Sequence, residues 1–152
     1  GSSKFTLKQF EEAIKDFDKA IELNPEDELS WYFRGYSKFN LKQFEEAIKD
    51  LDKAIELDPE DINAWHLRGS SKFTLKQFEE AIKDFDQAIK LDPENANVWH
   101  LRGRSKNRLK RYEEALKDLD KAIELNPEDD FTWYFRRLAN YFNKKTQKKN
   151  KS

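Results

Sequence analysis

The sequence predicts an all-α solenoid, a stack of helical hairpins that repeats every 34 residues. Proline, tryptophan and glycine each occur four times in the 152-residue chain, and each type recurs at a spacing of 34. The positions are Pro25, Pro59, Pro93 and Pro127; Trp31, Trp65, Trp99 and Trp133; and Gly1, Gly35, Gly69 and Gly103. The opening letters, GSSKFTLKQFEEAIKDFD, return unchanged at residues 69–86, two periods later. A fixed period of this length indicates short units that stack on one another.

Each copy contains two segments with helical periodicity. In the copy that begins at Glu28, residues 28–41 and 44–57 place apolar side chains three and four positions apart, as on one face of a helix. An Asn or Asp before each proline ends the second segment, because the residue before proline avoids the α region. The residues that we expect to cap the following helices are Asp27, Asp61, Asn95 and Asp129.

These residues resemble the tetratricopeptide repeat, a 34-residue helix-turn-helix unit with the pattern W-x2-L-G-x2-Y, A-x3-F, P. Trp31, Gly35, Ala47 and Pro59 match it in place, as do the residues 34 and 68 positions later. The resemblance implies a right-handed α-solenoid of such repeats. It also implies that the first helices line a concave surface that holds extended peptides or partner helices.

One departure from the pattern recurs in every copy. The leucine before glycine is replaced by arginine, at Arg34, Arg68 and Arg102. A partly buried arginine needs a charged partner, and each second helix carries an aspartate. We therefore predict a pair between arginine and the aspartate of the same copy, most simply Arg34 with Asp50.

The period also sets the expected boundaries. We expect one array over residues 1–145, followed by a disordered basic tail at 146–152 that lacks apolar side chains. Within the array we expect a partial repeat, three complete repeats and a capping helix, at 1–27, 28–61, 62–95, 96–129 and 130–145. In the partial repeat, the second helix is expected to begin near Phe10. The capping helix has Arg137 in place of glycine and Asn143 in place of leucine, as suits a polar outer face.

Composition argues against several functional classes. The 29 Lys and Arg nearly cancel the 30 Asp and Glu, so no global field draws the chain to nucleic acid or membranes. Cysteine is absent, which excludes disulfides and thiolate chemistry. No apolar run has the length of a signal-peptide core or a membrane span, so we expect a cytoplasmic location. The sequence does not start with methionine, so we expect that Gly1 is not the first translated residue.

The residues that could carry chemistry have simpler interpretations. His66 and His100 lie one period apart, and we interpret them as aromatic surface residues rather than a catalytic or metal pair, since Tyr32 and Tyr134 take the same position. Carboxylates recur in every copy, whereas an active site is singular, and there is no glycine-rich phosphate loop. The tail lysines have no aromatic residue among them for base stacking. We expect no enzymatic activity, cofactor or metal.

The remaining candidate site is the groove implied by the resemblance. Its expected lining residues lie on the first helix of each copy: Tyr32, Tyr36, Phe39, Asn63, His66, Ser70, Phe73, Asn97, His100, Arg104 and Arg108. Their character changes from aromatic in the first copy to cationic in the third. We therefore expect a protein or peptide partner with an apolar anchor and acidic residues.

One binding mode known in the family is not expected here, and one other function competes with peptide binding. Family members that grip a C-terminal carboxylate use Lys, Asn and Arg at positions that here hold Tyr32, Tyr36, Leu67, Asn97 and Leu101. The resemblance therefore does not extend to that clamp. A competing function is head-to-tail self-assembly through the incomplete terminal repeats, although we expect a monomer.

Overall fold

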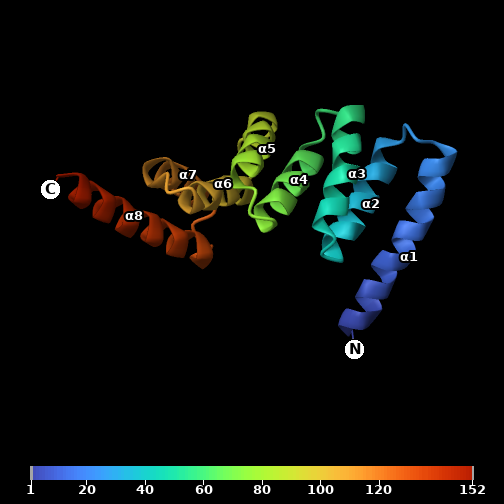
Figure 1. Ribbon diagram of the computed structural model, residues 1–152, viewed down its shortest axis with the longest axis horizontal. Helices are drawn as coiled ribbons and strands as arrows, with labels where there is room; N and C mark the ends of the chain where they lie inside the picture. Colours follow the sequence, from blue (N-terminus) through green and yellow to red (C-terminus); the bar gives the residue numbers. More distant parts are fainter. Residues whose placement is uncertain (1, 152) are drawn as a thin grey trace. The chain divides into compact units, whose positions relative to one another are not determined.

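The computed structural model describes residues 2–151, and this range contains eight α-helices and no β-strand (Figure 1). The chain divides into two compact units, Gly1–Lys76 and Gln77–Ser152. Unit 1 holds α1 (Ser2–Leu23), α2 (Glu28–Asn40), α3 (Phe44–Leu57) and α4 (Ile62–Thr74). Unit 2 holds α5 (Phe78–Leu91), α6 (Ala96–Arg108), α7 (Tyr112–Leu125) and α8 (Asp130–Lys151). The predicted all-α repeat fold is confirmed.

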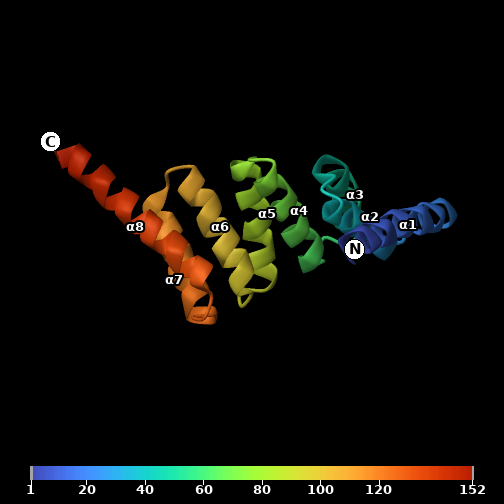
Figure 2. The same cartoon turned by 90° about the horizontal axis from the view of Figure 1, so that it is seen from below.

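Within each unit, successive helices pack side by side as antiparallel neighbours joined by short turns (Figures 1 and 2). The core of unit 1 is built on the second helix of a repeat, with Ala47, Leu51 and Ala54 fully buried on α3. In unit 2, Ala115 and Leu119 of α7 pack with Ala139 of α8. No helix in the described range is long and apolar enough to cross a membrane.

Glycine sets the distance between the two helices of a repeat. A Cβ atom at Gly35 would lie 3.1 Å from Cγ of Leu51, and one at Gly103 would lie 2.8 Å from Cγ of Leu119. These distances are shorter than carbon–carbon contacts in packed cores. The first helix therefore approaches the second closely only because these positions lack a side chain.

An ion pair accompanies this close approach. Arg34 donates to Asp50 through both Nε (2.9 Å) and Nη2 (2.7 Å), as we predicted, and Asp50 is only 2% exposed. Arg102 and Asp118 reproduce the geometry in unit 2. Each arginine also donates from Nη1 to an aspartate of the preceding repeat, which is Asp18 for Arg34. The arginine thus links two repeats.

Tryptophan and proline share a period because they bond to each other. The indole Nε1 of Trp31 donates to the carbonyl of Pro25 at 2.8 Å, and the other three pairs do the same at 2.8–2.9 Å. The face of Trp31 lies 5.0 Å below the Arg34 guanidinium. The tryptophan therefore fixes the inter-repeat turn at one edge and supports the buried arginine at its face.

The predicted helix caps form at three of the four positions. The side chains of Asp61, Asn95 and Asp129 accept hydrogen bonds from backbone N–H groups at the start of the following helix. Asp27 makes no such bond. Its carboxylate instead accepts a 2.8 Å bond from the hydroxyl of Ser30.

The amino-terminal helix differs from the expected partial repeat. We predicted a break before a second helix near Phe10, but α1 runs without interruption from Ser2 to Leu23 (Figure 1). In the identical later copy, the chain turns at Lys76, which adopts a left-handed φ of 65°. That conformation costs about 1 kcal/mol for a residue with a Cβ atom. In unit 1 the chain makes the same turn at Lys42, with a φ of 63°, where a full first helix, α2, packs on α3.

The carboxyl-terminal helix is also longer than predicted. Residues 146–152 were expected to be disordered, but α8 continues to Lys151 and projects past α7 (Figure 2). Gln147 donates to Glu113 at 3.1 Å, which ties this segment to α7. The segment contains no glycine or proline, and lysines in the last turn complement the negative end of the helix dipole. Ser152 lies outside the described residues.

We predict that Asp50→Asn lowers the free energy of unfolding by about 3 kcal/mol, because it leaves Arg34 partly buried beside a neutral group. Urea unfolding measures the loss. The matched control is Glu45→Gln, at an exposed position of the same helix, which should change stability little. Equal effects of the two substitutions would show that the pair is not structural.

Candidate functional site

In unit 1, the candidate site begins with an aromatic cluster on α2. The rings of Tyr32 and Tyr36 stack with their centroids 6.4 Å apart, and Phe10 of α1 meets Tyr36 edge-on at 6.2 Å. Tyr36 remains 41% exposed. Phe39 packs edge-to-face on Phe44, and both Phe39 and Tyr32 are partly buried against the core cluster. Of the three predicted aromatic residues, Tyr36 is therefore the one that is exposed.

The neighbouring row lies on α4. Asn63 is exposed in the first turn, and its backbone N–H donates to the capping Asp61. His66, Ser70 and Phe73 follow along the helix and are each partly buried. Burial lowers the pKa of His66, so its imidazole is neutral at pH 7. This row is mostly uncharged, in keeping with the aromatic row beside it.

In unit 2, the predicted residues on α6 are Asn97 and His100 in its first half and Arg104 and Arg108 in its second half. Asn97 is exposed near the start of the helix. His100 was interpreted as a surface residue, and this is wrong: it is 7% exposed. Its Nδ1 lies 2.8 Å from Oγ1 of Thr132, and its ring meets Phe135 edge-on. The cause is α8, which packs over this part of α6 and encloses the imidazole.

Two arginines make the rest of the α6 face cationic. The Arg104 guanidinium lies 4.1 Å from the ring centroid of Phe135, and that of Arg108 lies 4.9 Å from that of Phe78. Burial and then the charge of Arg108 lower the pKa of Arg104 from its ordinary value. The charges stand one helical turn apart on one face, where they repel each other. An anion bound between them would relieve this repulsion.

An acidic cluster in unit 1 was not found from the sequence. Glu28 begins α2, and its Oε1 is buried with no hydrogen-bond partner in the described part of the chain. Its pKa is raised to about 8 by burial first, then by a hydrogen bond with Asp61 and by the charges of Asp61, Asp58 and Asp27. Asp58 and Asp61 belong to the following inter-helix turn, about 30 residues away. Repeat spacing alone gives no signal of this cluster.

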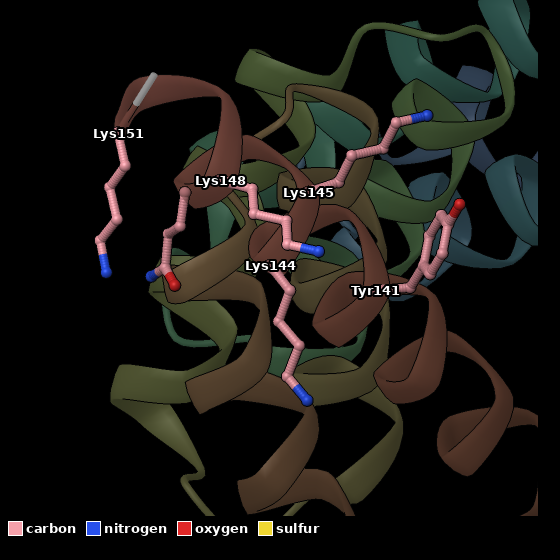
Figure 3. Close-up of a pocket in the computed structure, with 6 residues that line it drawn as sticks. Tyr141, Lys144, Lys145, Lys148 and Lys151 are labelled. Carbon is pink, nitrogen blue, oxygen red and sulfur yellow. The ribbon is translucent and has the colours of Figure 1, made fainter.

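The outer surface of α8 forms a second candidate surface. A shallow hollow there is lined by Tyr141, Lys144, Lys145, Gln147, Lys148 and Lys151. The side chains of the tyrosine and the four lysines project from the helix (Figure 3). Tyr141 is 59% exposed. No aromatic residue lies among these lysines in the sequence, but the helix places the preceding Tyr141 beside them. The surface therefore combines positive charge with an exposed ring.

Among residues 2–151, no group of three or more His, Asp or Glu side chains is arranged to hold a metal ion. The histidines themselves have different surroundings. His100 is enclosed between α6 and α8, whereas His66 is only partly buried.

Comparison with known proteins identifies the repeat. The tetratricopeptide repeat pattern matches residues 1–27, 29–61, 62–95 and 96–129. None of the curated proteins compared with the chain matches it. The solved structures it resembles include MamA from Desulfovibrio magneticus RS-1, at 20% identity and a TM-score of 0.80, with 96% of this chain and 89% of that chain covered.

Two further solved structures contain bound peptides. The first TPR of Spaghetti (RPAP3), bound to the HSP90 peptide SRMEEVD, is 27% identical with a TM-score of 0.73, covering 75% of this chain and 90% of that one. The second TPR domain of human RPAP3, in complex with the HSP70 peptide SGPTIEEVD, is 25% identical with a TM-score of 0.71. That comparison covers 74% of this chain and 93% of the human domain.

The raised pKa of Glu28 predicts a pH-dependent stability. In the unfolded chain its pKa is about 4.3, so the folded state holds the proton more tightly between about pH 4.5 and 8. Stability from this group is complete below the unfolded pKa and is lost as pH rises through the folded one. Glu28→Gln cannot ionise, so its stability relative to the parent should increase between pH 5 and pH 8. Urea unfolding at several pH values measures this difference, with Glu45→Gln as the control.

A difference in stability between Glu28→Gln and the parent that stays constant with pH would contradict the raised pKa of Glu28.

Proposed function

We propose that this chain, which belongs to the tetratricopeptide repeat family, is a non-enzymatic protein-interaction scaffold that binds extended peptides on its first-helix faces. The observation that carries the proposal is the exposed ring of Tyr36, held against Tyr32 and Phe10. Packing of the hydrophobic core does not explain why a large aromatic ring is exposed at this position. A large ring fixed by its neighbours offers contact area at little cost in conformational entropy.

The face of unit 1 suits an apolar or aromatic anchor. Tyr32 and Tyr36 form a stacked surface, while His66, Ser70 and Phe73 on α4 add neutral polar and aromatic groups. Burial and the charges of the acidic cluster raise the pKa of Tyr32, so its hydroxyl remains a hydrogen-bond donor at neutral pH. The preferred ligand segment therefore contains a ring or branched apolar side chain and no acidic residue next to it.

The face of unit 2 suits acidic residues. Arg104 and Arg108 present two guanidinium groups on α6, each held over an aromatic ring. A guanidinium group binds a carboxylate through two parallel hydrogen bonds, so the fixed orientation favours Asp or Glu. The peptides SRMEEVD and SGPTIEEVD, bound by the two related domains, are also acidic. This similarity supports an acidic ligand segment for this chain. It does not make HSP90 or HSP70 partners of this chain.

The proposal is tested with two fluorescent peptides, one with a Trp-Leu anchor and neutral flanks and one with four consecutive Glu. Tyr36→Ala should weaken binding of the first peptide by about tenfold with no change in salt dependence. Arg104→Glu with Arg108→Glu should weaken binding of the second by more than tenfold and flatten its salt dependence.

Matched controls separate the site from general charge effects. Lys83→Glu with Lys117→Glu changes the net charge equally on exposed positions of second helices and should leave both affinities unchanged. Thermal unfolding of each variant checks that the arginine substitutions do not unfold unit 2. The peptide SRMEEVD should bind weakly, because Tyr32, Tyr36 and Leu67 replace polar residues of the carboxylate clamp. Unchanged binding of the Glu peptide to the double arginine variant would refute the cationic face.

A further inference from the structure

Positive charge is concentrated on α6 and the turn that follows it. Residues 102–111, RGRSKNRLKR, contain six Lys and Arg side chains and no Asp or Glu. Two of these cations, Arg104 and Arg108, have no charged counterpart on α2 or α4. The equivalent positions there hold the neutral residues Tyr36, Asn40, Ser70 and Thr74. The repeat fold therefore does not require a cation at either position.

Three of the other cations are used by the packing of unit 2. Arg102 donates two hydrogen bonds to Asp118, and Lys106 forms a 2.9 Å ion pair with the same carboxylate. Arg111 pairs with Glu79 at 2.6 Å. Both carboxylates belong to second helices, α7 and α5. These three cations are therefore neutralised inside the unit.

Arg104 and Arg108 are held by aromatic rings. The guanidinium group of Arg104 lies over Phe135 of α8, and that of Arg108 lies over Phe78 of α5. A ring attracts a guanidinium group through its quadrupole but adds no negative charge. Burial and then the charge of Arg108 lower the pKa of Arg104, whereas a hydrogen bond to aspartate raises the pKa of Arg34. The rings thus fix the two side chains without cancelling their charge.

Two guanidinium groups on one helix face require more than a single carboxylate supplies. Positions four apart on a helix bring the two Cβ atoms within about 6 Å of each other. A carboxylate has one charge and two oxygens, and one guanidinium group satisfies both oxygens. A phosphate monoester has a charge of about −1.5 to −2 and three acceptor oxygens. One phosphate group can therefore bond both arginines, and its charge balances theirs.

The positive surface is too short for a nucleic-acid backbone. The preceding residues of the same row on α6 are Asn97 and His100, and burial lowers the pKa of His100, so its imidazole is neutral at pH 7. Beyond Arg108, Arg111 is paired with Glu79. A nucleic acid presents a phosphate at every nucleotide and binds along a continuous basic groove. A single phosphate group on a peptide fits the two arginines better.

We propose that Arg104 and Arg108 bind a phosphorylated serine or threonine side chain of an extended peptide. This inference rests on the proposed function, because it names the acidic group that the cationic face of unit 2 selects. Phe135 and Phe78 position the two guanidinium groups. Phosphorylation of the partner then controls its binding, since the unmodified hydroxyl group carries no charge.

The test uses the full chain and three fluorescent peptides, Gly-Leu-Ala-X-Ala-Leu-Gly, in which X is phosphoserine, Glu or Ser. Anisotropy should show that the phosphoserine peptide binds at least about tenfold more tightly than the Glu peptide, and the Ser peptide least tightly. Arg104→Gln and Arg108→Gln should each remove this preference. Lys117→Gln, at an exposed position on α7, is the matched control and should keep it. Thermal unfolding checks that each variant folds, and the exposed position of Arg108 makes its variant the safer one.

The outcomes separate this inference from the proposed function. Equal affinity of the phosphoserine and Glu peptides for the parent would overturn the phosphate site, while binding of the four-Glu peptide would still support the cationic face. Failure of all the acidic peptides to bind would overturn both. A short oligothymidylate that binds as tightly as the phosphoserine peptide, and loses affinity in Arg108→Gln, would also overturn the inference, since the ligand would then be a nucleic acid.

Discussion

The close contact between glycine and the second helix, at Gly35 in unit 1 and Gly103 in unit 2, is the constraint on which the packing of both units depends. Gly35 lets the backbone of α2 approach Leu51, and this approach brings Arg34 within bonding distance of Asp50. A carboxylate with 2% exposure is tolerated only because the guanidinium group meets it with two hydrogen bonds. The guanidinium group in turn rests on Trp31, whose indole bonds the carbonyl of Pro25. These residues recur together because each one needs the position that the others create.

The period therefore predicted the helices, their partners and the buried ion pair, but not the two ends of the chain. Residues 1–18 and 69–86 are identical in sequence, yet the later copy turns at Lys76 while the described part of the earlier one is a single helix. The local sequence is thus compatible with both structures. Within unit 1 the turn at Lys42 joins two full helices, α2 and α3, that pack on each other. The helical continuation of α8 also involves a neighbouring helix, since Gln147 donates to Glu113 on α7, 34 residues earlier.

Helix geometry placed the candidate residues along the first helices but did not give their depth. Tyr36 and Arg108 are exposed, whereas Phe39 is partly buried against the core cluster and His100 is covered by α8. Depth depends on the next helix along the chain, which differs from copy to copy. The acidic cluster at Glu28 was missed for the same reason, because Asp58 and Asp61 approach it from the following turn. A repeat pattern treats each copy as equivalent, and these groups arise where the copies meet.

The residues that stabilise the array differ from those that we propose for recognition. Gly35, Arg34 and Asp50 are held in the contact between α2 and its neighbours, while Tyr36 on the same helix reaches solvent. In unit 2, Gly103, Arg102 and Asp118 repeat the first set, but the exposed face carries Arg104 and Arg108 instead of tyrosines. Substitutions on that face leave the glycine contact and its ion pair unchanged. Each repeat can therefore acquire its own ligand chemistry without loss of the packing that all repeats share.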